Sequence, residues 1–275
     1  MTAAFEHPTA ASPDRLPALL APLTDLVLRA GAAIMAIPRD AKVTQKLDGS
    51  PVTPADLAAD RVIAEGLAAI APGVPVLSEE SCDRGRPTTG SFFVVDPLDG
   101  TKEYIAGRDE FTVNLALVSD GVPVLGLVCA PALGLAWRGV VGQNAERLTI
   151  AANGIGFTTS AIRTRPLPEP GQPWTATVSR SHLDPRTLAF ITGRPGAVHA
   201  TLGSSLKFCR IAEGEADIYP RLAPICEWDI AAGAALVIAA GGKVTDASGA
   251  PLRFDEPRPN FIVPDFIAWG DRNGR

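Results

Sequence analysis

The sequence predicts a layered α/β protein made of two fused subdomains, and two observations support this prediction. In the first half of the chain, two helical patterns precede a series of short apolar strands. In the second half, strands alternate with helical patterns, an order that favours helices packed on a sheet. We therefore place one subdomain at residues 21–160 and the other at residues 174–275, after a mobile extension of residues 1–20.

The first half begins with two amphipathic helices. Apolar residues recur at steps of three and four over residues 19–34. Thr53 and Pro54 then supply a cap and a first-turn proline for a second helix over residues 55–70. Runs of β-branched and aromatic residues follow, with a hairpin turn before the last of them. The expected strands cover residues 74–77, 92–95, 112–118 and 122–128.

A proline-rich connector separates the halves. Residues 162–173 contain four prolines and no periodic apolar pattern, which is typical of a semi-rigid linker. Strands and helices alternate beyond it. The expected strands cover residues 175–178, 197–200 and 216–219, and the expected helices cover residues 185–191, 206–212 and 230–240.

Composition excludes several classes of protein. With 275 residues, 46% of them hydrophobic and 20% charged, the chain can bury a core and is neither disordered nor fibrous. A formal charge of −5 argues against a partner such as a nucleic acid polymer, which needs a broad basic surface. The longest apolar stretch, residues 230–242, is shorter than the roughly 20 residues of a membrane span, so we expect no transmembrane segment.

The cysteines and the amino terminus favour a cytoplasmic location. Four cysteines without CxxC spacing are interpreted as reduced thiols, because a chain of this length needs no disulfide staples. The first ten residues lack the basic cluster and apolar segment of a secretory signal. Peripheral attachment to the inner membrane stays open, since the sequence has no lipidation signal to decide it.

Carboxylates at strand ends are the most informative feature of the sequence. Asp96 and Asp99 follow the apolar run of residues 92–95, in the string Asp-Pro-Leu-Asp-Gly. Glu79 or Glu80 ends another apolar run, and Asp229 opens a helix. Taken alone, Asp229 fits a helix cap, the glutamates fit solvated surface acids, and the aspartates fit a turn. Gathered together they would repel one another unless protonated or neutralised, and hard cations such as Mg²⁺ take oxygen ligands.

Four strings of residues carry a resemblance to a known family. LSEES, DPLDGTKEY, EFTVNLALV and EWDIAAGAAL follow one another along the chain. Together they resemble the magnesium-dependent, lithium-sensitive inositol monophosphatase superfamily. SRSH and GSSLKFCRIAEGEADIYPR are most similar to its 3'(2'),5'-bisphosphate nucleotidase branch, of the CysQ type. The resemblance covers residues 26–242 and implies a sugar-phosphatase-like αβαβα sandwich.

The resemblance also implies roles for individual residues. The implied metal ligands are Glu79, Asp96, the backbone carbonyl of Leu98, Asp99 and Asp229. Asp56 and Thr101 match the catalytic pair that deprotonates the attacking water in this family. Two or three Mg²⁺ ions are the implied cofactor, and Li⁺ is an implied inhibitor. Two such ions can bind one phosphate, activate water and stabilise the leaving oxygen.

Substrate contacts are expected in both halves of the chain. Backbone N–H groups of Gly100 and Thr101 lie where we expect a helix to start, a geometry that binds phosphate. The implied nucleotide contacts in the second half are His182, Gly203, Ser204, Ser205 and Lys207, with Asp229 shared between metal and substrate. Without the resemblance, each fits an ordinary surface residue or helix start. Lys46 is interpreted as an ordinary exposed lysine, and Trp228 as a core residue.

The resemblance implies a hydrolase that converts 3'-phosphoadenosine 5'-phosphate, a small phosphorylated nucleotide, to AMP and phosphate. An inositol-1-monophosphatase or another sugar phosphatase is the nearer alternative, since metal ligands are shared across the superfamily. An inactive nucleotide- or metal-binding regulator is the alternative from another class, and it predicts the loss of a ligand or of the catalytic pair. Every one of those positions is filled here. The sequence leaves monomer and homodimer open.

Overall fold

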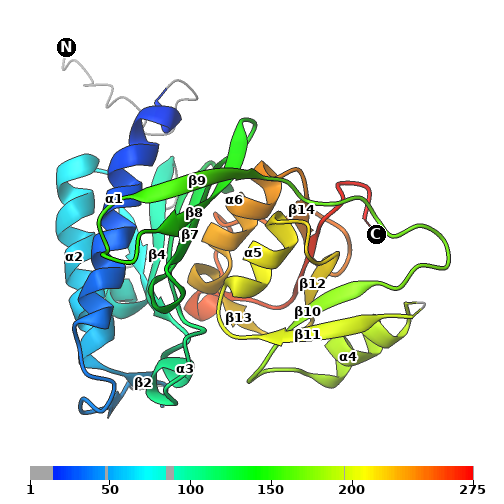
Figure 1. Ribbon diagram of the computed structural model, residues 1–275, viewed down its shortest axis with the longest axis horizontal. Helices are drawn as coiled ribbons and strands as arrows, with labels where there is room; N and C mark the ends of the chain where they lie inside the picture. Colours follow the sequence, from blue (N-terminus) through cyan, green and yellow to red (C-terminus); the bar gives the residue numbers. More distant parts are fainter. Residues whose placement is uncertain (1–14, 47–48, 85–89, 195, 275) are drawn as a thin grey trace.

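The computed structural model describes residues 15–46, 49–84, 90–194 and 196–274 (Figure 1). A seven-stranded sheet forms its first half, in the order β3-β4-β5-β6-β7-β8-β9. β3 and β4 are parallel, and all the other pairs are antiparallel. The strands are β3 (Val76–Ser78), β4 (Ser91–Asp99), β5 (Thr112–Ser119), β6 (Val122–Ala130), β7 (Leu135–Val140), β8 (Asn144–Ile150) and β9 (Phe157–Ile162).

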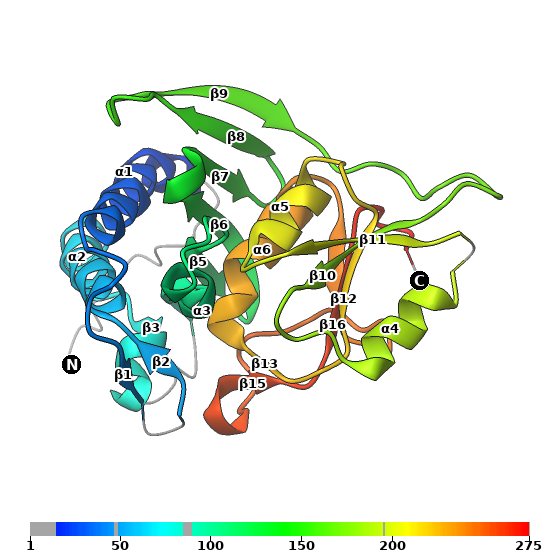
Figure 2. The same cartoon turned by 60° about the horizontal axis from the view of Figure 1, so that its bottom comes forward.

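Two helices cover one face of this sheet (Figure 2). They are α1 (Leu16–Met35) and α2 (Pro54–Ile70), and their buried apolar residues share one core with β4, β5 and β6. Residues 16–20, assigned to the extension above, are helical, while residues 1–14 lie outside the described part. By length and composition alone α1 could cross a membrane. Its buried face packs in the core, so it is a core helix of this fold.

Two further helices lie between the first sheet and a second one. α5 (Leu206–Ala212) and α6 (Ala231–Ala239) share a single large core with residues of both sheets. The second sheet has the order β11-β10-β12-β16-β14, and α4 (Pro185–Thr192) packs on its outer face. Its strands are β10 (Thr175–Ser179), β11 (Val198–Leu202), β12 (Ile218–Arg221), β14 (Lys243–Thr245) and β16 (Phe266–Trp269).

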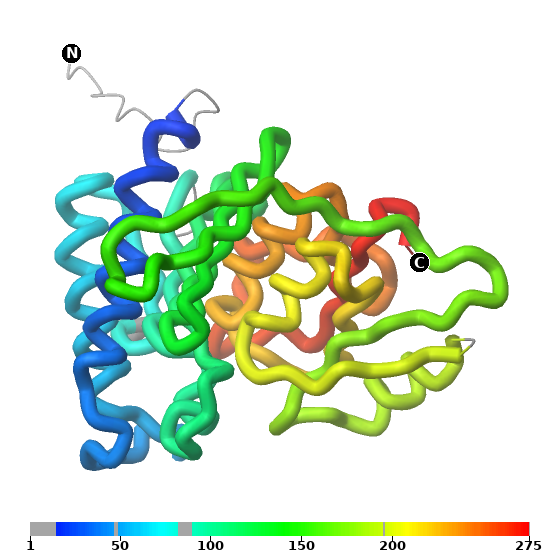
Figure 3. The backbone as a smooth tube through the Cα atoms, viewed as in Figure 1, coloured from blue at the N-terminus to red at the C-terminus, as the bar shows by residue number. Residues whose placement is uncertain are grey.

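The layers therefore run helix, sheet, helix, sheet, helix, which confirms the predicted αβαβα sandwich. The tube in Figure 3 shows the segment after β9 passing from one sheet to the other. The two sheets use residues 76–162 and 175–269, on either side of the predicted connector. The boundaries of two subdomains stay a prediction.

The hairpin between β5 and β6 confirms the expected turn. Asp120 and Gly121 both have positive φ, at 48° and 77°, as a tight two-residue connection requires. Strands β7, β8 and β9 were not expected. Residues of β8 and β9 are partly exposed and lack a clean apolar run, whereas most residues of β7 are buried. In β9, five of the six residues are exposed. Backbone pairing with the neighbouring strand forms β9 rather than burial of its own side chains.

Candidate active site

Two parallel strands bring the first carboxylates to one edge of the seven-stranded sheet. β3 pairs with β4 so that Ser78 lies opposite Val95. Glu79 follows β3 directly, and Asp96 is the next residue of β4. Their side chains therefore leave the sheet next to each other, as expected if the two strands run alike.

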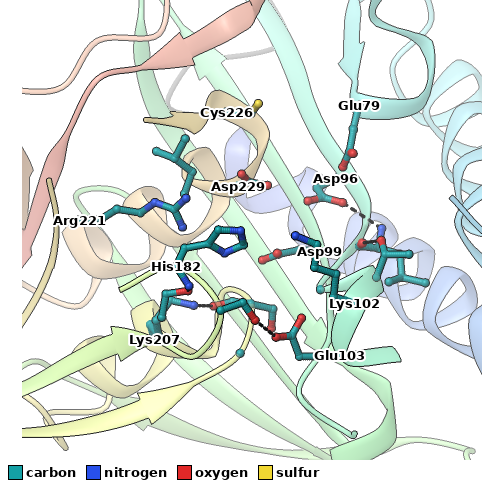
Figure 4. A pocket seen from close by; sticks show the side chains of 18 of the residues that line it. Glu79, Asp96, Asp99, Lys102, Glu103, His182, Lys207, Arg221, Cys226 and Asp229 are labelled. Carbon is teal, nitrogen blue, oxygen red and sulfur yellow. Dashed lines mark hydrogen bonds between the residues drawn. The ribbon is translucent and has the colours of Figure 1, made fainter. Parts of the chain in front are cut away.

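A third carboxylate comes from the second half of the chain. Asp229 ends the short 3-10 helix Glu227–Asp229, and one residue separates it from α6. One carboxylate oxygen from each of Glu79, Asp96 and Asp229 lies within 4.8 Å of the other two, and Figure 4 shows these side chains facing one another. Residues that are 150 positions apart in the sequence thus meet at one point. We call these three residues, together with Asp99, the acidic wall.

Asp99 and Leu98 lie beside the three-carboxylate cluster. Asp99 ends β4, and its carboxylate accepts a hydrogen bond from the amide of Asn114 at 3.2 Å. Its oxygens are outside the group within 4.8 Å, although it lines the same cavity. The Leu98 carbonyl accepts from the Thr101 hydroxyl at 3.2 Å. Gly100 follows with φ of +92°, a left-handed conformation that lets the chain turn from β4 into α3 (Thr101–Ile105).

The electrostatics of the acidic wall favour a cation. Asp96 is 1% exposed, and among the described residues its Oδ2 atom has no hydrogen-bond partner. Burial, followed by the charges of Glu79, Asp99 and Asp229, raises the pKa of Asp96 well above its usual range. Burial and the charges of Asp99 and Glu79 raise the pKa of Asp229 to about 8. These carboxylates fit hard divalent cations, which would satisfy the buried oxygen and offset the repulsion.

Asp56 and Thr101 form a hydrogen-bonded pair at the end of the cluster. The Thr101 hydroxyl donates to Asp56 Oδ1 at 2.9 Å. Asp56 is the third residue of α2, and its Oδ2 atom accepts from both the backbone N–H and the hydroxyl of Thr53, at 2.8 and 2.6 Å. This reciprocal cap holds the Asp56 carboxylate, which is 2% exposed, in one orientation. The arrangement gives Thr101 a fixed proton acceptor.

Lys46 is not the ordinary exposed lysine predicted above. Its ammonium donates to Glu79 and Glu80, each at 2.7 Å, and its side chain is only 20% exposed. Burial lowers the pKa of Lys46, but the two carboxylates more than offset this, so its pKa is raised. Burial raises the pKa of Glu80 to about 7 despite Lys46. These contacts could not be predicted from local sequence patterns, because the partners lie more than 30 residues away.

Basic side chains occupy the opposite side of the site, as Figure 4 shows for His182, Lys207 and Arg221. We call these three residues the basic wall. Lys207 is 4% exposed and donates to the carbonyls of Ser204 and Leu202, the latter at 3.5 Å. Burial lowers its pKa to about 8, although Asp99 opposes the shift. Burial and then Arg221 lower the pKa of His182.

Arg221 was missed by sequence reasoning. It is the last residue of β12 and lines the cavity. Its Nε atom is buried and has no hydrogen-bond partner among the described residues, while one terminal nitrogen donates to the Pro224 carbonyl at 3.2 Å. A basic residue at the end of a strand that leads into the site was the available signal, in the string Ile-Tyr-Pro-Arg.

Two residues of the glycine-serine turn before α5 line the cavity, and the third faces the protein interior. Gly203 and Ser204 line the cavity, and Ser204 has a positive φ of 41°. Ser205 does not line it, contrary to the predicted substrate contact. Its hydroxyl accepts from Asn114 at 3.0 Å and donates to the Asp229 carbonyl at 3.3 Å. Ser205 thus ties the turn to the acidic wall, because it is 1% exposed and faces inward.

The acidic and basic walls enclose one cavity of about 310 Å³. Two predicted site residues do not line the cavity. Asp56 lies behind Thr101, and Ser205 lies behind the glycine-serine turn. The other predicted site residues do line it, namely Glu79, Asp96, Leu98, Asp99, Gly100, Thr101, His182, Gly203, Ser204, Lys207 and Asp229.

Comparisons with known proteins agree with this geometry. The model of the inositol monophosphatase family matches residues 18–270. The 3'(2'),5'-bisphosphate nucleotidases CysQ of Salmonella typhimurium and of Escherichia coli K12 are each 39% identical over 253 residues, covering 90% of this chain and 98% of theirs.

Solved structures show the same fold. CysQ from Bacteroides thetaiotaomicron, described as a bacterial member of the inositol monophosphatase family, superposes with a TM-score of 0.73 at 34% identity, covering 92% of this chain and 97% of that one. The IMPase of Thermotoga maritima has a TM-score of 0.72 at 26% identity, covering 94% and 93%. The chain therefore belongs to the inositol monophosphatase family.

Proposed function

We propose that this chain is a Mg²⁺-dependent 3'(2'),5'-bisphosphate nucleotidase that hydrolyses 3'-phosphoadenosine 5'-phosphate to AMP and phosphate. One observation carries the proposal: a single cavity has a cluster of carboxylates on one side and the cations Lys207 and Arg221 on the other. A substrate with two phosphates could place one at each wall. The CysQ relatives, at 39% identity, support the same activity.

The carboxylates of the acidic wall would hold the cations, together with the Leu98 carbonyl. When bound there, divalent ions would lower the pKa of the attacking water and offset charge on the leaving oxygen. Asp96 supplies an oxygen that protein groups leave unsatisfied. The residues around it do not need to provide a nucleophile of their own, because water can serve in that role.

Proton removal from the attacking water falls to Asp56 and Thr101. The Thr101 hydroxyl already donates to Asp56 Oδ1 at 2.9 Å, so it can accept a proton from water while passing its own to the carboxylate. Thr53 holds the other oxygen of Asp56 with two hydrogen bonds, which keeps Oδ1 directed at Thr101. The backbone N–H groups of Gly100 and Thr101 would hold the phosphate that is cleaved.

The basic wall would bind the phosphate that is not cleaved. Lys207 is confined by burial, and both Lys207 and Arg221 donate to backbone carbonyls, so little side-chain entropy is lost when they bind an anion. Arginine can bind phosphate with two parallel hydrogen bonds. A phosphate beside Lys207 would also favour its charged form, against the effect of burial.

The proposal also includes inhibition by Li⁺ and a cytoplasmic role in sulfur metabolism, both by analogy with the family. An inositol or sugar phosphatase is the competing activity, because the family and the fold are shared with the IMPase of Thermotoga maritima.

Turnover of 3'-phosphoadenosine 5'-phosphate, adenosine 3'-phosphate and inositol 1-phosphate tests the proposal, with and without Mg²⁺ and Li⁺. We expect kcat/KM to be highest for the bisphosphate and turnover to require Mg²⁺. Equal kcat/KM on all three substrates would reject the nucleotidase, and a preference for inositol 1-phosphate would favour the sugar phosphatase.

A further inference from the structure

Glu110 connects the first half of the chain to the loop that carries His182 and to the turn that precedes Lys207. It lies between α3 and β5, outside the cavity. Its Oε2 atom accepts a hydrogen bond from the backbone N–H of Gly203 at 2.8 Å. The guanidinium of Arg180, two residues before His182, donates to both Glu110 oxygens at 2.8 to 3.0 Å.

The turn at Gly203 packs directly on Glu110. A Cβ atom at position 203 would lie 2.6 Å from the Glu110 carbonyl oxygen and 2.8 Å from the Glu110 Cβ. Both distances are too short for a side chain, so only glycine allows this approach. The carboxylate and the backbone of Glu110 together fix where the turn lies.

The position of the turn determines where two groups of the cavity point. The Lys207 ammonium donates to the carbonyls of Leu202 and Ser204, on either side of Gly203. The Ser204 hydroxyl is buried, and among the described residues it has no hydrogen-bond partner. Ser204 also has the positive φ that an unsupported serine rarely adopts. A rotation of the turn would move both the ammonium and this hydroxyl.

We propose that Glu110 is a positioning residue for recognition of the second phosphate, acting through the Gly203 N–H to hold Ser204 and Lys207 in place. This inference rests on the proposed nucleotidase function. The alternative is that Glu110 only pairs with Arg180 to hold the two halves together. That ion pair is partly exposed, with side chains 34% and 24% accessible, and such pairs change an equilibrium by about fivefold at most.

Three variants separate the two explanations. Glu110→Met keeps the approximate length of the side chain but removes both carboxylate oxygens. Glu110→Gln loses the charge but keeps a carbonyl oxygen for the Gly203 N–H. Arg180→Met removes the ion pair and leaves the Glu110 carboxylate on Gly203. None of these residues lines the cavity, so the variants leave the acidic wall unchanged.

The measurement is steady-state kinetics on 3'-phosphoadenosine 5'-phosphate and adenosine 3'-phosphate at saturating Mg²⁺, with a thermal melt of each variant. For Glu110→Met we expect KM for the bisphosphate to rise about tenfold, since a buried N–H loses its acceptor. We expect kcat to stay within about twofold, because no group at the acidic wall changes. KM for adenosine 3'-phosphate should change by less than about twofold, because that substrate lacks the second phosphate. For Glu110→Gln and Arg180→Met we expect KM for the bisphosphate within about threefold of wild type.

Equal increases in KM for all three variants would show that the ion pair is responsible and would overturn the proposal. An equal increase in KM for both substrates would also overturn it. If Glu110→Met melts below the assay temperature, the comparison of Glu110→Gln with Arg180→Met decides. In that case the proposal requires both variants to keep KM for the bisphosphate within about threefold of wild type, and a larger rise in Arg180→Met contradicts it. Failure of the proposed function appears separately, as a wild-type enzyme that does not prefer the bisphosphate.

Discussion

The acidic wall consists of residues at strand ends and just before a helix, whereas two residues of the basic wall, His182 and Lys207, follow segments that are held by the other half of the chain. Glu79 and Asp96 are fixed by the parallel pairing of β3 with β4. Lys207 instead donates to carbonyls of the turn at Gly203, which Glu110 supports from a distance of 93 residues. Strand pairing therefore positions residues that take part in the reaction, and contacts between distant turns position Lys207, which is proposed to bind substrate.

This contrast predicts that changes on the two walls alter different kinetic constants. Loss of an acidic residue should lower kcat, because those groups act on the phosphate that reacts. Loss of a basic residue should raise KM, because those groups hold a phosphate that does not react.

The largest effect is expected at the acidic wall. Asp96→Asn removes a charged ligand and should lower kcat at least about 10³-fold, since charge stabilisation by a bound metal contributes several kcal/mol. The thermal midpoint of the metal-free protein should not fall, because the change also removes repulsion among buried carboxylates. Phosphate release and a thermal melt measure the two effects. Full activity in this variant would exclude Asp96 as a ligand.

The next effect concerns proton transfer. Thr101→Val removes the hydroxyl that donates to Asp56 and should lower kcat about 10²-fold, at the lower end for general base catalysis. KM should stay nearly unchanged. Thr101→Ser is the matched control, since it keeps the hydroxyl and should retain most of the activity. Wild-type kcat in Thr101→Val would exclude the Thr101 hydroxyl from proton transfer.

On the basic wall, Arg221→Met should raise KM for the bisphosphate about 10-fold to 100-fold, the loss of one charge-assisted contact. KM for adenosine 3'-phosphate should change little, because that substrate has no second phosphate. Arg186→Met, at an exposed arginine on α4, controls for the loss of a positive charge. A fall in kcat with unchanged KM would place Arg221 in the reaction itself.

The smallest effect concerns the stability of the metal-free protein. The pKa of Asp229 is about 8 in the folded state and 3.8 in its ordinary state, so between these pH values only the folded state keeps the proton. Unfolding then releases a proton, and stability falls as pH rises from about 4 to about 8. We expect the thermal midpoint in EDTA to be lower at pH 8 than at pH 5, and Mg²⁺ to restore it at pH 8.

Asp229→Asn is the comparison for this prediction. It has no proton to release, so its midpoint should fall less between pH 5 and pH 8 than that of the wild type. Equal pH dependence in both proteins would mean that Asp229 is not held protonated by its neighbours.

Much of the acidic wall could be predicted from sequence, because its signals are local. An apolar run followed by acidic residues marks a strand end, and the parallel pairing of two such runs brings Glu79 beside Asp96. Asp229 needed the family resemblance as well, since an aspartate before a helix also fits a cap. The α/β class followed from the helix and strand patterns, whereas the order of the five layers was implied by the family resemblance.

The contacts that could not be predicted join residues far apart in the chain. Lys46 reaches Glu79 across 33 residues from a polar loop, and loops leave no periodic pattern. Ser205 looked like a substrate contact, but its hydroxyl is used between Asn114 and the Asp229 carbonyl. Strand β9 is formed by backbone pairing and has almost no buried side chains to reveal it.

Neighbouring glutamates offer the most direct test of the acidic wall. Glu79 and Glu80 both accept from Lys46 at 2.7 Å, but only Glu79 has an oxygen in the three-carboxylate cluster. Mn²⁺ binding to wild type, Glu79→Gln and Glu80→Gln, followed by electron paramagnetic resonance of the free ion, compares them directly. Groups that merely orient metal ligands change affinity by about 10-fold to 100-fold, so Glu79→Gln should weaken binding at least about tenfold. Glu80→Gln should bind within about threefold of wild type, because it removes no ligand. Equal affinities for the two variants, or no binding to wild type, would contradict a shared metal site.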